Sequence, residues 1–322
     1  YVVYGKTDTS AIDLANIAKG VGGFAITAPS PQWNGVSVTA AGDVNGDGFA
    51  DLLVGAYKAN SNAGSSYVIF GGVNRLTQGT ALVQGDSGAN TLVGTSASEV
   101  INGGKGDDTL TGGGGIDRFF GGAGNDTLSF VGATTGISFD IAANLTGTMT
   151  VSDGLGGSDT VSNFEYAVGG SGHDTITGSV GANSISGGAG DDSLMGGLGA
   201  DTLWGGDGND LFVAIADNAR DIYYGDAGFD TISYRDVAVA INTNTGTGFY
   251  SQNSTSIYFL VNGQSQYFNS IEGLIGGQAN DVLQNKSTSA VYFDGYLGND
   301  TLIGGIGNDS IFGGAGDDSI DD

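Results

Sequence analysis

Carboxylates recur at a fixed spacing in this sequence, next to glycine, and oxygen ligands at short range are the chemistry that a calcium ion requires. Of the 35 acidic residues, 32 are Asp, and 62 of the 322 residues are Gly. Asp beside Gly suits tight turns, in which carboxylate and carbonyl oxygens can surround one hard cation. We therefore predict several Ca2+ sites, with ligands from one position of a repeated unit: Glu99, Asp108, Asp117, Asp126, Asp174, Asp192, Asp201, Asp210, Asp230, Asp281, Asp300, Asp309 and Asp318.

These acids stand at the sixth position of a nine-residue unit, G-G-x-G-x-D-x-U-x, in which U is large and apolar. Copies, some of them degenerate, occupy residues 85–102, 103–129, 169–213, 225–233, 276–284 and 295–321. Glycine allows the positive φ of a tight turn, and the last three residues alternate polar and apolar as in a short strand. Two units then complete a coil of 18 residues whose apolar side chains point inward.

Stacked coils place each acid beside the one 18 residues later. Two carboxylates about 4 Å apart repel by roughly 4 kcal/mol at an effective dielectric constant near 20, and a cation between them reverses the sign. We expect these pairs to meet: Asp108 with Asp126, Asp174 with Asp192, Asp192 with Asp210, Asp300 with Asp318, and, on the opposite edge, Glu99 with Asp117 and Asn183 with Asp201. Asn90 and Asn183 replace the expected Asp, so sites there are expected to be weaker or absent.

The units resemble the RTX (repeats-in-toxin) nonapeptide family of secreted bacterial proteins, over roughly half of the chain. The resemblance implies a calcium-filled parallel β-roll that binds multiple Ca2+ ions. It also implies export through a type I secretion channel, with folding outside the cell.

A second candidate calcium loop lies near the N-terminus, where residues 43–51 read DVNGDGFAD. The side chains of Asp43, Asn45, Asp47 and Asp51 have the spacing that wraps one calcium ion. An EF-hand is excluded because Val54 stands where its Glu is required and the flanks are strand-like. The surrounding sequence resembles the FG-GAP repeat of integrin-α-type β-propellers.

The fold class that follows is all-β, with parallel β-roll segments, inserted β-hairpins and an N-terminal FG-GAP-type unit. We expect an FG-GAP-type unit with a calcium loop, then three rolls that alternate with two inserted β segments. The expected bounds, in that order, are 1–80, 81–129, 130–168, 169–233, 234–275 and 276–322.

The inserted segments are expected to extend or cap the edges of the roll. Asn262-Gly263 between two apolar runs predicts a hairpin in the second of them. Core packing is the favoured role of its aromatic residues, and a ligand surface made by Tyr250, Tyr258 and Tyr267 is the alternative.

Composition excludes several classes of function. The net charge of −26 disfavours nucleic acid and anionic membrane surfaces as partners, and no apolar run is long enough for a membrane span. The chain has no Cys, and its one His, His173, is expected to be solvated, so neither a thiol nor a His-based triad is available. Metal ligation accounts for the paired Asp residues, and we expect no enzymatic activity.

We therefore expect a calcium-dependent structural or adhesive segment of a secreted, cell-surface or matrix bacterial protein, with calcium driving folding outside the cell. Its partners would be cell-surface or matrix components, or copies of itself. The alternative is the calcium-binding accessory and secretion region of a larger secreted enzyme of protease or lipase type. The chain begins without Met and ends within a repeat, so we expect an excerpt of a longer protein.

Overall fold

The chain folds into two compact units, Tyr1–Leu82 and Val83–Asp322. The computed structural model describes residues 2–3, 23–24, 37–42, 51–56, 65–69, 81–146, 149–155, 157–217, 219–243, 257–261, 264–286 and 288–321. No helix in these ranges has the length and apolar character needed to span a membrane.

The N-terminal unit contains an antiparallel sheet of three strands: β3 (Ser37–Gly42), β4 (Asp51–Ala56) and β5 (Ser65–Ile69). Two short strands, β1 (Val2–Val3) and β2 (Gly23–Phe24), pair antiparallel in a separate sheet. Asp51 is the first residue of β4, and the strand expected directly after it is confirmed. Asp43, Asn45 and Asp47 lie outside the described residues.

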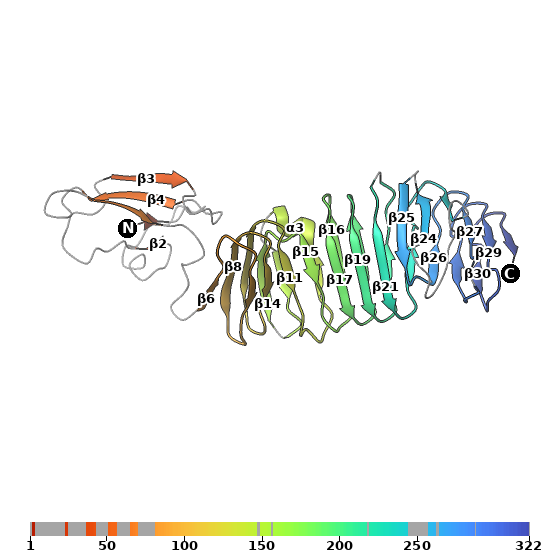
Figure 1. The fold of residues 1–322 in the computed structure, drawn as a ribbon, viewed down its shortest axis with the longest axis horizontal. Helices are drawn as coiled ribbons and strands as arrows, with labels where there is room; N and C mark the ends of the chain where they lie inside the picture. The colour runs from red at the N-terminus through yellow and green to blue at the C-terminus, as the bar shows by residue number, and fades with distance from the viewer. Residues whose placement is uncertain are drawn as a thin grey trace, which may run out of the picture. The chain divides into compact units, whose positions relative to one another are not determined.

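The second unit is a solenoid in which short parallel strands stack along one axis (Figure 1). A 13-stranded sheet runs the length of one face. Its strands are β7 (Thr91–Val93), β9 (Thr109–Thr111), β11 (Thr127–Ser129), β15 (Tyr166–Val168), β17 (Ser184–Ala189), β19 (Thr202–Asp207), β21 (Ile222–Ala227), β25 (Gln264–Asn269), β24 (Ile257–Val261), β23 (Ile241–Asn242), β27 (Val282–Gln284), β29 (Thr301–Ile303) and β31 (Ser319–Asp321).

The opposite face is divided between two sheets. The five-stranded sheet contains β6 (Ala81–Gln84), β8 (Glu99–Lys105), β10 (Arg118–Ala123), β14 (Ser158–Ser162) and β13 (Met149–Ser152). The eight-stranded sheet contains β12 (Ser138–Asp140), β16 (Thr175–Ser179), β18 (Ser193–Gly197), β20 (Leu211–Val213), β22 (Thr231–Ser233), β26 (Gly273–Ile275), β28 (Tyr292–Asp294) and β30 (Ser310–Phe312). The short helix α3 (Ile141–Thr146) follows β12 directly.

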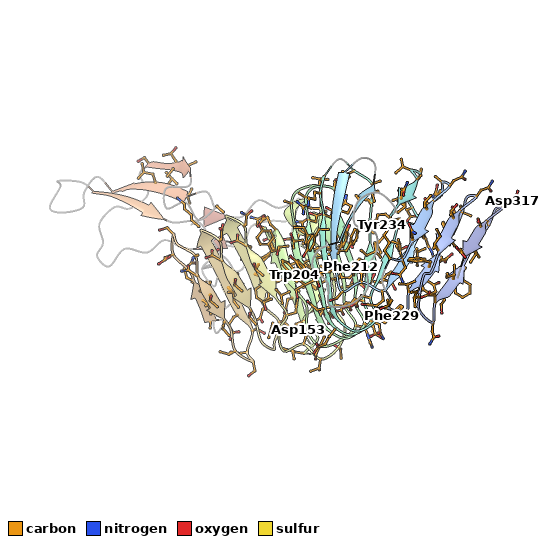
Figure 2. The ribbon with its side chains drawn as sticks, turned by 45° about the vertical axis from the view of Figure 1, so that its right-hand side comes forward. Asp153, Trp204, Phe212, Phe229, Tyr234 and Asp317 are labelled. Carbon is orange, nitrogen blue, oxygen red and sulfur yellow. The ribbon has the colours of Figure 1, made fainter. Side chains whose placement is uncertain are left out.

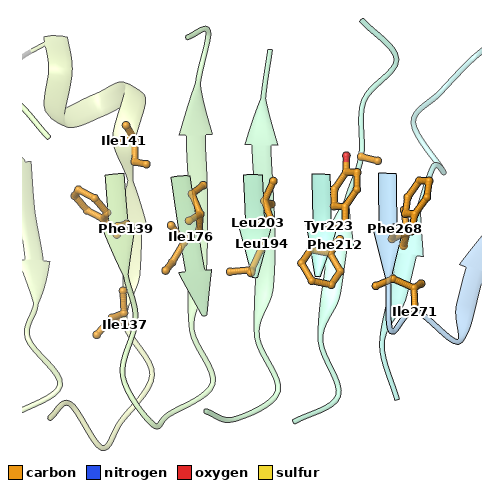
Figure 3. Close-up of a cluster of buried hydrophobic side chains, with 14 of the residues drawn as sticks. Ile137, Phe139, Ile141, Ile176, Leu194, Leu203, Phe212, Tyr223, Phe268 and Ile271 are labelled. Atoms are coloured by element: carbon orange, nitrogen blue, oxygen red, sulfur yellow. The ribbon is translucent and has the colours of Figure 1, made fainter. Parts of the chain in front are cut away.

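The register confirms the predicted coil of 18 residues. Leu203 lies opposite Ile185 in the 13-stranded sheet, and Leu194 opposite Ile176 in the eight-stranded one. These eighth-position side chains are completely buried. Figure 3 shows Ile176, Leu194 and Leu203 between the sheets, and Phe212, which is also an eighth-position residue, lies inside the stack in Figures 2 and 3. Removing a Leu or Ile side chain of this size from water contributes about 1.5–3 kcal/mol.

The two inserted segments enter the solenoid in different ways. The first supplies β13 and β12, which are terminal strands of the five- and eight-stranded sheets, as the expected capping of roll edges requires. The second lies inside the 13-stranded sheet, so the expectation of an edge position is wrong for this insert. Its strand β25 pairs parallel with β21, so pairing through the sheet continues across the insert.

The predicted hairpin at Asn262-Gly263 is confirmed, because Val261 of β24 pairs with Gln264 of β25. The alternative ligand surface is only partly described. Tyr250 lies outside the described residues, Tyr258 is placed only by its backbone in β24, and Tyr267 has its ring 5.6 Å from that of Tyr224.

Leu194→Ala is expected to lower the free energy of unfolding by about 2–5 kcal/mol, because the completely buried Leu194 side chain leaves a cavity in a thin core. Denaturant unfolding in saturating calcium measures the change. Val180→Ala, at a side chain that is 79% exposed, is the control and is expected to change the value by less than about 0.5 kcal/mol. Equal effects of the two variants would contradict the assignment of Leu194 to the core.

Candidate calcium-binding turns

The sixth-position acids form ladders along both edges of the solenoid. The backbone N–H of Asp174 donates to Oδ1 of Asp192 at 2.7 Å, and that of Asp192 donates to Oδ1 of Asp210 at 2.8 Å. The other predicted pairs meet through the same contact: Asp108 with Asp126 at 2.9 Å, Asp300 with Asp318 at 3.0 Å, Glu99 with Asp117 at 2.8 Å and Asn183 with Asp201 at 2.8 Å.

The remaining predicted acids in the solenoid also lie on these ladders. Asp230 accepts the N–H of Asp210 at 2.9 Å. Asp281 and Asp309 accept from the apolar residues Ile241 and Val291, at 2.7 and 2.9 Å. In the preceding coil, Asp281 and Asp309 therefore have an apolar residue as ladder partner, and a carboxylate can neighbour them only in the following coil.

The second carboxylate oxygen of most ladder acids is buried and has no partner. Among the described residues, this holds for Oδ2 of Asp108, Asp117, Asp126, Asp192, Asp201, Asp210, Asp230, Asp300 and Asp309. A buried charged oxygen without a donor is costly unless a cation or a proton satisfies it. A row of buried carboxylate oxygens without hydrogen-bond donors is the feature of these turns that fits bound calcium ions.

Turn carbonyls lie close to these oxygens. A Cβ built on Gly187 would lie 2.2 Å from Oδ2 of Asp192 and 2.8 Å from the carbonyl oxygen of Gly205 in the following coil. Calcium takes about six to eight oxygen ligands. In the described part of the chain, no three acidic or His side chains are grouped so that they could hold one metal ion. An ion here would therefore take carboxylates from two coils together with turn carbonyls.

The Asn residues on the ladder have their own hydrogen bonds. Oδ1 of Asn90 accepts the N–H of Asp86 at 2.7 Å, and Nδ2 of Asn183 donates to the carbonyl of Glu165 at 2.8 Å. The side chains of both residues have hydrogen-bond partners without an ion. This supports the prediction that calcium sites are weaker or absent at these positions.

A second ladder, at the fifth position of the turns, runs in the opposite direction. Oδ1 of Asp191 accepts the N–H of Asn209 in the following coil at 2.8 Å, and Oδ1 of Asn299 accepts that of Asp317 at 2.9 Å. His173 belongs to this ladder. Its ring is exposed as predicted, but it is not merely solvated, because Nδ1 accepts the N–H of Asp191 at 2.7 Å.

Four ladder acids do not follow from the nine-residue repeat, because they lie outside its units: Asp159, Glu165 and Glu272 in the inserted segments, and Asp221 in the break between residues 213 and 225. Asp159 accepts the N–H of Asp117 at 2.8 Å, and Glu165 accepts that of Asp126 at 2.8 Å. Asp221 and Glu272 accept the N–H groups of Asp201 and Asp230, at 3.1 and 3.0 Å. The usable signal is the buried apolar residue two positions after each acid: Val161, Ala167, Tyr223 and Leu274.

Burial raises the pKa of many of the ladder acids, and for several of them, such as Asp126 and Asp192, acids of adjacent coils raise it further. The pKa rises to about 7 for Asp126, Asp159, Asp192, Asp201 and Asp230, and to about 6 for Asp117, Asp221 and Asp281. For Asp192 the contributing neighbours are Asp174 and Asp210, and the N–H bond from Asp174 acts against them.

Without calcium, the solenoid is expected to be more stable at pH 5 than at pH 7.5. Several ladder acids have a pKa of about 7 when folded against 3.8 when unfolded. The folded state therefore binds more protons between these values, and its stability falls as pH rises through about 7. Circular dichroism of the metal-free protein at both pH values measures this, and more β-sheet signal is expected at pH 5 than at pH 7.5.

The matched experiment in saturating calcium is expected to show the opposite sign, because protons then compete with calcium for the same oxygens. Higher stability at pH 7.5 than at pH 5 in the metal-free protein would contradict the burial of these acids.

Comparison with known proteins gives two family matches. The model of the RTX calcium-binding nonapeptide repeat (4 copies) matches residues 84–117, 93–128, 168–203, 190–214, 201–232 and 294–321. The model of the FG-GAP repeat matches residues 34–69. No curated protein sequence matches the chain significantly.

Among solved structures, the extracellular lipase LipA from Serratia marcescens aligns with 16% sequence identity and a TM-score of 0.24. The alignment covers 60% of this chain and 38% of the lipase chain, so this chain corresponds to well under half of that protein.

Proposed function

We propose that this chain, which carries RTX calcium-binding nonapeptide repeats and an FG-GAP repeat, is a calcium-dependent structural and adhesive segment of a secreted or cell-surface bacterial protein. RTX repeats bind multiple Ca2+ ions and indicate a calcium-binding segment of a secreted protein. The observation that carries the proposal is the row of buried, unpartnered Oδ2 atoms along the turns.

The ligands we propose for these ions are the sixth-position acids together with turn carbonyls. In most of these acids, as in Asp192 and Asp210, an N–H of the preceding coil donates to Oδ1, which leaves Oδ2 to face its own turn. Bound calcium supplies the positive charge that the stacked carboxylates lack. The N-terminal loop with Asp43, Asn45, Asp47 and Asp51 is proposed as a further site, separate from the roll.

Calcium would then determine when the chain folds. The unfolded chain has no stacked turns, so the free energy of calcium binding becomes free energy of folding. The low calcium of a bacterial cytosol would keep the repeats unfolded, and the higher calcium outside the cell would fold them. The domain bounds predicted from the sequence remain our proposal for how the chain is organised.

Adhesion is the finer part of the proposal, and the FG-GAP match supports it. The test immobilises the full chain and measures calcium-dependent retention of collagen, fibronectin, a bacterial exopolysaccharide and a soluble copy of the chain. Retention of one probe in calcium and its release by chelator is the expected result. If no probe is retained by a chain that still folds with calcium, the adhesive role is overturned and the accessory-region alternative is favoured.

A further inference from the structure

The five-stranded sheet ends in a hairpin that is not made of repeats. Strands β13 and β14 pair antiparallel from Met149–Val161 to Ser152–Ser158, and β14 stacks in parallel on β10. Asp153 directly follows β13, at the start of the hairpin loop. It is not a sixth-position acid, and the matched repeats end before it and resume after it.

The carboxylate of Asp153 is inside the protein, and only its Oδ1 is satisfied. The side chain is 4% exposed. Oδ1 accepts the N–H groups of Leu155 and Gly157, both at 2.8 Å. Oδ2 is buried and makes no hydrogen bond within the described residues. The loop is therefore closed by one carboxylate oxygen while the other is directed inward.

Two further carboxylates, Asp117 and Asp159, have a pKa raised by burial, and they lie close enough for the charge of Asp153 to raise it further. Asp117 is completely buried and its Oδ2 is also unpartnered among the described residues, while Asp159 is 1% exposed. Asp153 and Asp159 line the same small pocket, with Phe119 and Phe130.

A backbone carbonyl reaches the same place. A Cβ built on Gly157 would lie 1.8 Å from the carbonyl oxygen of Gly115 and 2.9 Å from Oδ2 of Asp153. The hairpin loop thus stacks on the repeat turn that contains Gly115, and an oxygen of each lies close to Gly157. Between two stacked repeats, the position of the hairpin loop would be occupied by a second glycine-rich turn.

We propose that the hairpin loop and the repeat turn before it form a divalent-cation site, with Asp153 as a carboxylate ligand from outside the repeats and calcium as the ion. Asp159 and the carbonyl of Gly115 complete the inner side, and the buried charge of Asp117 adds to the attraction for the ion. The ion fastens the hairpin onto the end of the five-stranded sheet. The inference rests on the proposed calcium binding and extends it to a place that the repeats do not specify.

The test is anomalous diffraction from crystals of the full chain grown with Tb3+ in place of calcium. We expect a peak next to Asp153 in addition to peaks between the repeat turns. Peaks between the repeat turns without one at Asp153 would overturn this inference and leave the proposed function intact. The absence of peaks from both places would overturn the proposed function itself.

Two variants, each read by native mass spectrometry in calcium, give an independent measurement. Asp153→Asn keeps the acceptor for Leu155 and Gly157 but removes the charge, so it is expected to bind one calcium ion fewer than the unaltered chain. The control is Asp140→Asn in the same insert, whose Oδ1 accepts the N–H of Ala143 at 3.0 Å, and it is expected to lose none. Equal counts for Asp153→Asn and the unaltered chain would overturn the inference.

Discussion

Transfer of the folded chain from calcium to excess chelator at pH 7.5 is expected to abolish the β-sheet circular dichroism of residues 83–322. The ladder acids would then be left with buried, unpaired charges along both edges of the solenoid. An ion present at about 100 times its Kd stabilises the fold by about 2.7 kcal/mol per site, and a domain has about 5–15 kcal/mol of stability in total. The loss of a few ions is therefore sufficient to unfold it.

The control adds chelator that is already saturated with calcium, which is expected to leave the spectrum unchanged. Addition of excess calcium to the chelated chain is expected to restore the spectrum. A β-sheet signal that persists after exhaustive removal of calcium would contradict calcium-driven folding, whatever the number of ions in the folded chain.

Gly206→Val is expected to prevent stacking of the coils and to leave the solenoid largely unfolded even in calcium. Gly206 has a φ of 112°, which a β-branched residue adopts only with strain. Its Cβ would also lie 1.9 Å from the carbonyl oxygen of Gly188 in the coil before. Because the contacted atom belongs to the backbone of Gly188, neither coil can move away without breaking the strand pairing between β17 and β19. Circular dichroism and the calcium dependence of folding measure the effect.

Gly132→Val is the matched control. Gly132 has a similar φ of 103°, but a Cβ at this position meets nothing within 4 Å. It isolates the backbone strain, which is expected to cost about 1–3 kcal/mol and to leave the fold intact in calcium. If both variants fold equally well, contact between coils is not what requires glycine at position 206.

The sequence was most informative where one coil follows another without interruption. The period of 18 residues placed Asp174, Asp192 and Asp210 on one ladder and their apolar partners in one core, because turn and strand are both determined within nine residues. The match of predicted to observed pairs in these stretches follows from purely local geometry.

Prediction failed where the chain leaves the coil and returns. Glu165 follows Asp126 on the ladder after 39 residues, and Glu272 follows Asp230 after 42. The positions of Glu165 and Glu272 on the ladder depend on where β15 and β26 join the sheets. The nine-residue spacing does not determine that point. The role proposed for Asp153 was not predictable for the same reason, since it depends on a hairpin that packs on a turn distant in sequence.

His173 shows a different limit. Its exposure was predicted, but a side chain at the surface of a stacked turn still has the backbone N–H of the next coil within reach. The N-terminal loop remains a prediction, because Asp43, Asn45 and Asp47 lie outside the described residues.

The unequal division of the two faces has a mechanical consequence. One face is a single 13-stranded sheet, whereas the other passes from the five-stranded to the eight-stranded sheet between their terminal strands β13 and β12. A rod continuous on one side and seamed on the other has its lowest bending stiffness at the seam. Under load, the solenoid would bend there first. The 13-stranded sheet would stay paired and act as the hinge, and the hairpin of β13 and β14 would separate from β12 on the other face.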